Sequence, residues 1–362
     1  MAVPLCQYFG VCGGCSTQHI DYAVQLQNKK KNVAAAIKTD KIKVFSGSPY
    51  NYRNRLEVFF HPKGFGLRKR ANPSRIVDIG ECVISEPGIN ALVAEMRLFF
   101  SEPVCAELGN AVKHAILRTA SGGNALYFNL NGNALNLAGA METLKLFAQK
   151  AAVKNVALGY ADPENGSVKN ITFKGSMYTS EKYLDFTFLH SIDAFFQNNH
   201  AMANELHQYC NALLKKYKTS NASLLDLYGG VGTFGIINAS LFREVTIVES
   251  VSSAIESAKK NILENNVKNV RAVLLDASRL RKIPLNSPLF VITDPPRSGM
   301  DTKTILRLKE LQPETIIYVS CNVEQLKKDI PRFNKYKIQS AALFDFFPQT
   351  NHVEVVVELV KR

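Results

Sequence analysis

The pattern of apolar and polar positions divides the chain into two parts with different secondary structure. Between Tyr50 and Tyr183 the pattern predicts mostly short strands. Helical spacing occurs there near Ile89–Ser101 and Ala140–Lys150. The strands of this part are expected at Leu56–Phe60, Gly64–Lys69, Ile76–Ile79, Lys113–Ala120 and Ala125–Leu130.

From about Ser223 onward, short apolar runs alternate with helical patterns. The strands are expected at Leu224–Leu227, Val245–Val248, Val270–Leu275, Leu289–Thr293, Thr315–Val319, Lys337–Leu343 and Val353–Leu359, and the helices at Thr233–Leu241, Ser253–Asn265, Thr302–Leu311 and Glu324–Phe333. This alternation predicts an α/β fold with a Rossmann-like, doubly wound and mainly parallel sheet. In such a sheet the ligand crevice lies at the carboxyl ends of the strands.

A glycine-rich turn follows the first strand of the predicted sheet. Gly230 and Gly232 come shortly after Asp226, and the next strand ends on Glu249. Glycines let the backbone approach a ligand, and a carboxylate about 20 residues further on is placed to accept hydrogen bonds from ribose hydroxyls. We therefore expect a nucleoside-bearing cofactor. Together with Gly235, these two glycines satisfy the pattern of dinucleotide-binding loops. The position of Asp226, four residues before Gly230, is similar to that in loops that bind S-adenosylmethionine (SAM). The turn is therefore compatible with either a dinucleotide or SAM.

The charge balance favours a polyanionic partner. The formal net charge of the 362-residue chain is +13, which is typical of proteins that bind nucleic acid, although a basic solubilising surface has the same charge. Basic residues interleaved with aromatics, which suit phosphate contacts and base stacking, are Arg53, Arg55, Arg68, Lys69, Arg70 and Arg75 with Tyr52, Phe59 and Phe65. No apolar run approaches the length of a membrane span and no secretory segment follows Met1, so we expect a cytoplasmic protein without a membrane partner.

Three cysteines crowd the N-terminus, and a fourth follows several predicted strands. Cys6, Cys12 and Cys15 have the spacing C-x5-C-x2-C, and Cys82 lies further along the chain. Seven cysteines in a cytoplasmic chain argue against disulfides and towards metal binding or catalysis. Four thiolates can hold zinc or an iron–sulfur cluster, and the long gaps fit a [4Fe–4S] cluster of structural role better than zinc. Unligated core cysteines are the alternative.

Three further residues with useful chemistry lie where predicted strands end or begin. Asp294 precedes two prolines that fix a rigid turn, and Cys321 stands where a strand gives way to a helix, whose N-terminus favours a thiolate. Glu354 lies just inside the last strand, where burial would raise its pKa towards that of a useful base. A structural proline turn, a buried core cysteine and an exposed edge-strand acid are the plain alternatives.

Together these groups match the chemistry of methylation at C5 of uracil. C5 is a poor nucleophile until a thiolate adds to C6, and a base must afterwards remove the C5 proton so that the thiolate can leave. The reaction needs a nucleophilic cysteine, a general base and SAM in one crevice. The sequence offers Cys321, Glu354 and the glycine-rich turn for these three roles.

The chain resembles the RNA (uracil-5-)methyltransferase family over nearly its whole length. The resemblance is carried by the order FFQNN, DLYGGVG, DPPR, SCN and FPQTNHVE. It implies a class I methyltransferase in which Cys321 is the nucleophile and Glu354 the base. The residues it assigns to SAM or to orienting the target uracil are Gln197, Tyr228, Thr233, Glu249, Asp276 and Asp294, and those it assigns to a [4Fe–4S] cluster are Cys6, Cys12, Cys15 and Cys82.

The cluster motif is similar to that of the family's ribosomal RNA branch, which implies 23S rRNA as substrate, with tRNA as the alternative. Many cluster-bearing members carry an N-terminal TRAM domain, which this chain is too short before Cys6 to include. The expected organisation is a cluster segment at residues 1–48 and 76–86, a strand-rich RNA-binding domain at 49–185 and a SAM-binding domain at 186–362, in a monomer. An iron–sulfur dinucleotide oxidoreductase and a non-catalytic RNA-binding module are rival interpretations that do not need both Cys321 and Glu354.

Overall fold

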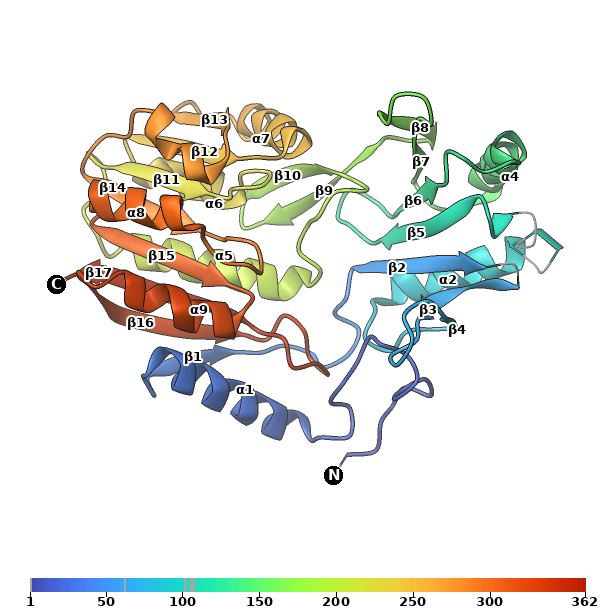
Figure 1. Ribbon diagram of the computed structural model, residues 1–362, viewed down its shortest axis with the longest axis horizontal. Helices are drawn as coiled ribbons and strands as arrows, with labels where there is room; N and C mark the ends of the chain where they lie inside the picture. The colour runs from blue at the N-terminus through green and yellow to red at the C-terminus, as the bar shows by residue number, and fades with distance from the viewer. Residues whose placement is uncertain (1, 62, 101–102, 105–107) are drawn as a thin grey trace. The chain divides into compact units, whose positions relative to one another are not determined.

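The computed structural model describes residues 2–61, 63–100, 103–104 and 108–362, so Met1 and Ser101 of the predicted ranges lie outside it (Figure 1). The chain forms two compact units. Unit 1 comprises residues 1–22, 48–181 and 190–200, and unit 2 comprises residues 23–47, 182–189 and 201–362. Both units are therefore built from segments that are distant in the sequence.

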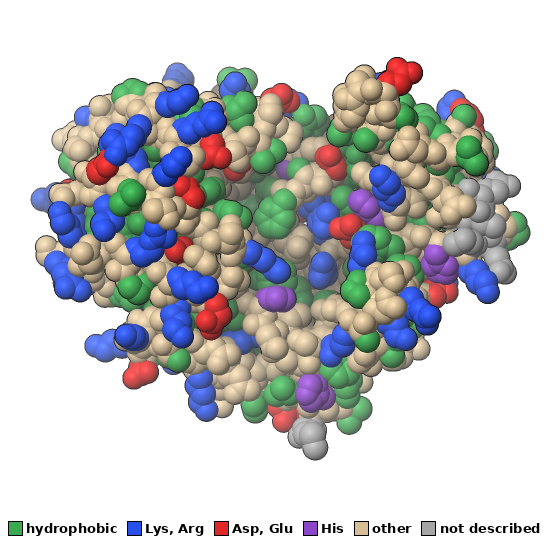
Figure 2. Space-filling view, in the orientation of Figure 1, with side chains coloured by type: hydrophobic (Ala, Val, Ile, Leu, Met, Phe, Trp, Pro, Cys, Tyr) green, Lys and Arg blue, Asp and Glu red, His purple; other side chains and the backbone are tan. Residues whose placement is uncertain are grey.

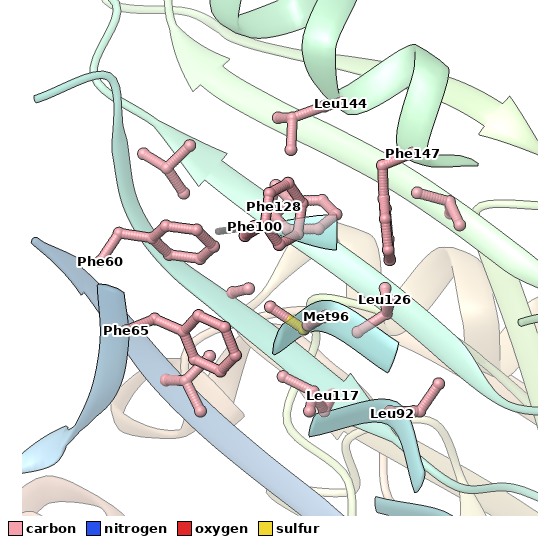
Figure 3. Packing of buried hydrophobic residues seen from close by; sticks show 14 of the residues in the cluster. Phe60, Phe65, Leu92, Met96, Phe100, Leu117, Leu126, Phe128, Leu144 and Phe147 are labelled. Atoms are coloured by element: carbon pink, nitrogen blue, oxygen red, sulfur yellow. The ribbon is translucent and has the colours of Figure 1, made fainter. Parts of the chain in front are cut away.

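Unit 1 contains a seven-stranded sheet, mostly antiparallel, covered on one face by helices. The strand order is β4 (Ile76–Asp78), β3 (Gly64–Arg68), β2 (Arg55–His61), β5 (Val112–Arg118), β6 (Ala125–Leu130), β7 (Asn155–Ala161) and β8 (Val168–Lys174). Helices α2 (Pro87–Phe99) and α4 (Leu137–Lys150) share one hydrophobic core with alternate residues of the strands, where Phe147 of α4 lies near Phe128 of β6 (Figure 3). The short β9 (Tyr178–Tyr183) and β10 (Phe186–Ser191) pair with each other.

Unit 2 contains an eight-stranded sheet, and its helices connect successive strands. The strand order is β1 (Ile42–Phe45), β16 (Tyr336–Phe344), β17 (Glu354–Lys361), β15 (Thr315–Ser320), β14 (Leu289–Thr293), β11 (Ser223–Leu227), β12 (Glu244–Glu249) and β13 (Val270–Leu274). Only β17 among the described strands of this sheet runs antiparallel to its neighbours. The helices are α1 (Tyr22–Ile37), α5 (His200–Leu214), α6 (Thr233–Ile237), α7 (Ser252–Glu264), α8 (Thr302–Leu311) and α9 (Val323–Asp329), with short 3-10 turns at Ala239–Leu241, Ala277–Lys282 and Ile330–Arg332.

The central strands of this sheet are buried on both faces, as expected when helices cover a parallel sheet. Every residue of β11, β14 and β15 is buried, which explains why these strands read as continuous apolar runs rather than alternating ones. The predicted doubly wound α/β sheet is therefore present, and its strands lie within a residue or two of the predicted ranges.

The N-terminal segment contributes to unit 2 in a way that the sequence pattern did not predict. Strand β1 pairs in parallel with β16, with Ile42 opposite Ala341, and so extends the sheet at one edge. Helix α1 packs through a stripe of buried residues at four-residue spacing, namely Gln25, Lys29, Val33 and Ile37. Residues 23–47 thus fold with the large sheet of unit 2 rather than with the cysteine-bearing segment. Within the described part of the chain, no helix is long and apolar enough to span a membrane.

Candidate active site

The parallel strands of unit 2 end at one edge of its sheet (Figure 1), and polar residues follow several of these strand ends in the sequence. Tyr228 follows β11, Glu249 ends β12, Asp294 follows β14 and Cys321 follows β15. Glu354 begins β17, which runs antiparallel to β15, so it lies at the same edge. The topology therefore brings together side chains that the sequence separates by more than a hundred residues.

The turn after β11 has the backbone geometry of a ligand-binding loop. Tyr228, Gly230 and Gly232 have φ of 62°, 54° and 89°, a left-handed conformation that glycine adopts without strain. A Cβ atom at Gly232 would lie 2.9 Å from Ile247 Cδ1, whereas a Cβ at Gly230 would meet no atom within 4 Å. Gly232 is thus required for packing, while the backbone at Gly230 faces open space that a cofactor can occupy.

Glu249 is fixed against this turn. One carboxylate oxygen accepts a hydrogen bond of 3.1 Å from Gly230 N, and the other accepts bonds from Ser250 N (2.6 Å) and Val251 N (2.8 Å). Backbone N–H groups orient the carboxylate without neutralising its charge. This arrangement suits an acceptor for ribose hydroxyls, so the turn and Glu249 fit the nucleoside part of SAM.

Asp226 is buried beneath the same turn. Its Oδ2 accepts a hydrogen bond of 2.8 Å from Gly235 N, which ties the start of α6 to the end of β11. Burial raises the pKa of Asp226 to about 7, and the nearby carboxylates of Asp294 and Glu249 act in the same direction. Asp226 is therefore a structural acid of the loop, and it is too deeply buried to contact a ligand directly.

Cys321 directly follows β15, and Glu354 begins the adjacent strand β17. Ser320 is opposite Val355 in the antiparallel pair of β15 and β17, so Cys321 and Glu354 extend that register at the edge. Glu354 is only 7% exposed. Burial raises its pKa well above the ordinary value, and Asp294 raises it further, whereas Arg297 lowers it. A buried carboxylate beside a thiol at a sheet edge is the arrangement expected of a general base and a nucleophile.

The thiol of Cys321 is less acidic than its position before a helix predicts. Burial raises its pKa to about 11, with further contributions from Glu354 and Asp294, while Arg297 lowers it. The expected effect of the helix N-terminus is weak because Asn322 Oδ1 already accepts hydrogen bonds from Glu324 N (3.1 Å) and Gln325 N (3.3 Å). The first N–H groups of α9 thus serve a cap rather than the sulfur.

The turn after β14 contains Arg297, the cation that lowers the pKa of the Cys321 thiol. Asn322 Nδ2 donates a hydrogen bond of 2.8 Å to the carbonyl of Arg297, which joins the two turns that carry Asp294 and Cys321. The buried Asp329 accepts hydrogen bonds from Tyr318 Oη (2.8 Å) and Met300 N (3.3 Å), and so fixes the far end of the same turn. The sequence pattern alone does not assign Arg297 a role in the site. Its electrostatic role beside the thiol emerges from the fold.

The other predicted cofactor residues have varied surroundings. Thr233 is the first residue of α6 and is half-buried, and burial raises the pKa of Tyr228 to about 12. Asp276 caps the following 3-10 turn by accepting a hydrogen bond of 2.8 Å from Ser278 N, and it stays exposed at the end of β13. Gln197 belongs to unit 1, in the segment after β10, whereas the remaining predicted cofactor residues all belong to unit 2.

The four N-terminal and central cysteines meet in unit 1. Cys6, Cys12, Cys15 and Cys82 all line one pocket of about 410 Å³. Burial raises the pKa of Cys15 to about 11, and the other three thiols raise it further through their charges. Among the described residues, no group of three or more His, Cys, Asp or Glu side chains has the arrangement of a ligand set for a single metal ion. The four thiols therefore line one pocket, and the [4Fe–4S] cluster stays a prediction from the sequence.

Comparison with known proteins gives consistent matches. The model of the tRNA (uracil-5-)-methyltransferase family matches residues 169–362. A tRNA (uracil(54)-C(5))-methyltransferase of Pyrococcus horikoshii is 31% identical over 98% of this chain and 85% of its own length. An uncharacterised RNA methyltransferase of Caldanaerobacter subterraneus is 30% identical over 98% of this chain and 84% of its own length.

One solved structure is similar over almost the whole chain. It is the tRNA (uracil-54, C5)-methyltransferase of Pyrococcus abyssi in complex with S-adenosyl-L-homocysteine, with a TM-score of 0.78, 25% identity and coverage of 97% of this chain and 86% of that chain. The α/β architecture predicted from the sequence is therefore that of a class I SAM-dependent methyltransferase. The match supports SAM, rather than a dinucleotide, as the ligand of the glycine-rich turn.

Proposed function

Because this chain belongs to the tRNA (uracil-5-)-methyltransferase family, we propose that it methylates C5 of a uridine in structured RNA, with Cys321 as nucleophile and Glu354 as base. The observation that carries the proposal is the register of β15 and β17, which supports a thiol and a buried carboxyl acting on one substrate ring. Neither rival interpretation from the sequence accounts for that pair, since neither an oxidoreductase nor a binding module needs it.

The environments of these residues support the proposed roles. Cys321 adds to C6 of the uracil once its thiol has lost a proton, and Arg297 is a cation that favours this loss. Bound SAM, held by the glycine-rich turn and Glu249, supplies the methyl group. Glu354 then removes the proton from C5, for which its burial and raised pKa suit it, and the C6–sulfur bond breaks. Asp294, Tyr228, Thr233, Asp276 and Gln197 are proposed to bind SAM or to orient the uracil.

Positive charge supports an RNA substrate. Lys and Arg side chains spread over the face of unit 2 around α8 and α9, where Lys303, Lys327 and Lys328 are exposed (Figure 2). In unit 1 the guanidinium of Arg68 lies 4.0 Å from the centre of the Phe59 ring. Part of the basic stretch predicted from the sequence has internal partners, because Arg53 Nε donates a hydrogen bond of 2.7 Å to Arg55 O.

We propose tRNA as the first substrate to test and 23S rRNA as the second. Relatives named for position 54 of tRNA align over 98% and 99% of the chain, which favours tRNA. The cysteine spacing, which is similar to that of the ribosomal RNA branch, favours 23S rRNA. A [4Fe–4S] cluster on Cys6, Cys12, Cys15 and Cys82 would tie residues 1–22 to the seven-stranded sheet of unit 1, where Gly13 N already donates a hydrogen bond of 3.0 Å to Arg68 O.

The substrate is tested by incubating the purified protein with radioactive SAM and either unmodified tRNA or protein-free 23S rRNA. Nuclease digestion and chromatography should yield labelled 5-methyluridine from one RNA in a roughly stoichiometric amount. The Cys321→Ala variant is the matched control and should yield none from either. Label in another nucleoside, or label that survives in the Cys321→Ala variant, would contradict the proposed function.

A further inference from the structure

The loop between β16 and β17 carries Glu354 at its end. Phe344 and Glu354 are paired across the two strands, so residues 345–353 form a closed loop between them. Gln349 within it has φ of 67°, a left-handed conformation that is unfavourable for a residue with a side chain. Contacts with other parts of the chain must therefore stabilise this loop conformation, because the local backbone preference of Gln349 does not favour it.

Helix α1 provides an ionic contact to the loop. Lys29 Nζ lies 2.6 Å from Asp345 Oδ1, and the two side chains are 5% and 0% exposed. The same ammonium donates a hydrogen bond of 3.1 Å to the carbonyl of Phe347. Burial lowers the pKa of Lys29, while Asp345 opposes that shift. A buried pair of this kind contributes little net stability, but removal of one partner leaves a buried charge, so it fixes geometry more than it adds free energy.

One helical turn earlier, α1 makes a reciprocal amide contact. Gln25 Nε2 donates a hydrogen bond of 2.9 Å to Gln349 Oε1, and Gln25 Oε1 accepts one of 3.2 Å from Gln349 N. Strand β1, which follows α1, adds a third contact, because Asp345 N donates a hydrogen bond of 2.9 Å to Phe45 O. Gln25, Lys29 and Phe45, all within residues 23–47, thus contact both halves of the loop 345–353.

We propose that Lys29 and Gln25 are positioning residues for the reaction, which hold the loop 345–353 so that Glu354 faces the site beside Cys321. They lie outside residues 169–362, the segment that the family model matches. The inference rests on the proposed function, since it assigns Glu354 the proton abstraction. It implies that residues 23–47 complete the active site of unit 2.

The test uses the full-length variants Lys29→Met and Gln25→Met. A loosened loop misplaces Glu354 more than the SAM-binding turn, so SAM affinity should stay within about twofold of wild type. Turnover should fall about tenfold to a hundredfold, the range that a displacement of about 1 Å produces. A methylated protein–RNA adduct should accumulate, because proton abstraction is the step that slows. Lys29→Arg, which keeps the charge, should restore part of the rate.

Lys361→Met is the matched control. Lys361 also belongs to unit 2 and pairs with Glu314 at 2.7 Å, but both side chains are partly exposed and the pair contacts a different part of the sheet. This variant should retain wild-type turnover without accumulation of adduct. Gln25→Met leaves no buried charge unpaired, so this variant tests the positioning role even if Lys29→Met does not fold.

Wild-type turnover without adduct in Gln25→Met and in folded Lys29→Met would overturn the proposal. An equal loss of SAM affinity, adduct formation and turnover would also overturn the proposal, because that pattern indicates general destabilisation of the protein. Failure of the wild-type protein to form 5-methyluridine would instead refute the proposed function, and the positioning role with it.

Discussion

The pKa of the Cys321 thiol can be shifted in opposite directions by changing its two charged neighbours. Glu354 raises this pKa and Arg297 lowers it, whereas burial is the largest cause of its value of about 11. Glu354→Gln should therefore lower the pKa of the thiol, and Arg297→Met should raise it. Because burial remains in both variants, the pKa should stay above the ordinary value of 9.0 in each.

The size of the effect follows from the raised pKa. A rise from 9.0 to about 11 lowers the thiolate fraction at neutral pH about a hundredfold. A charge within a few ångströms commonly shifts a pKa by about one unit or more, so each substitution should change the thiolate fraction about tenfold. The two variants should then differ from each other about a hundredfold in reactivity towards an alkylating reagent.

The assay is the rate of alkylation of Cys321 by iodoacetamide as a function of pH, followed by mass spectrometry of the peptide that contains it. Thiolate absorbance in the ultraviolet, taken as the difference between each protein and the same protein with Cys321→Ala, gives the pKa independently. Cys210 is fully buried in unit 2 and should remain unmodified, which reports on folding. A Cys321 pKa at or below 9.0 in the unsubstituted protein, or no separation of the two variants, would refute this account of the site.

Two other outcomes are expected. Anaerobically purified protein should be brown, with about four irons per chain. The variants Cys12→Ser and Cys82→Ser should lose the colour, whereas the control variant Cys210→Ser should keep it. Stoichiometric zinc without iron would refute the cluster. Asp226 has a pKa raised from 3.8 to about 7, so its contribution to stability is complete below about pH 4 and is lost as pH rises through about 7. Asp226→Asn should therefore raise the free energy of unfolding at pH 8, by about 4 kcal/mol, and by less than half as much at pH 5, in denaturant titrations. Equal effects at the two pH values would contradict the raised pKa.

The sequence predicts the regular core of unit 2 well, because its strands are buried on both faces and its helices are amphipathic. The ranges predicted for β14 and α8 coincide with the observed Leu289–Thr293 and Thr302–Leu311. The general rule for parallel sheets predicts Asp294 and Cys321 at one edge, whereas Glu354 lies there because β17 runs antiparallel to β15. Their roles nevertheless stay predictions until the chemistry is measured.

The contribution of α1 and β1 could not be predicted in the same way. Lys29 begins a run of three lysines, which is typical of a solvated helix face, yet it is buried against Asp345. Its partner lies 316 residues away, and no local pattern reports such a pairing. The pKa of the Cys321 thiol could not be predicted for the same reason, because its burial and its charged neighbours Glu354, Asp294 and Arg297 all depend on the fold.

The central claim is that Cys321 acts as the nucleophile and Glu354 as the base that removes the C5 proton. The most direct test incubates the Glu354→Gln variant with radioactive SAM and substrate RNA and separates the products on a denaturing gel. The neutral amide is nearly isosteric with the carboxyl group but too weak a base. Addition and methyl transfer should proceed while elimination stalls, which gives a band of protein joined to methylated RNA that carries the label. Cys321→Ala should give neither the band nor 5-methyluridine, although SAM still binds. Wild-type turnover by Glu354→Gln without the band, or 5-methyluridine from Cys321→Ala, would contradict the account.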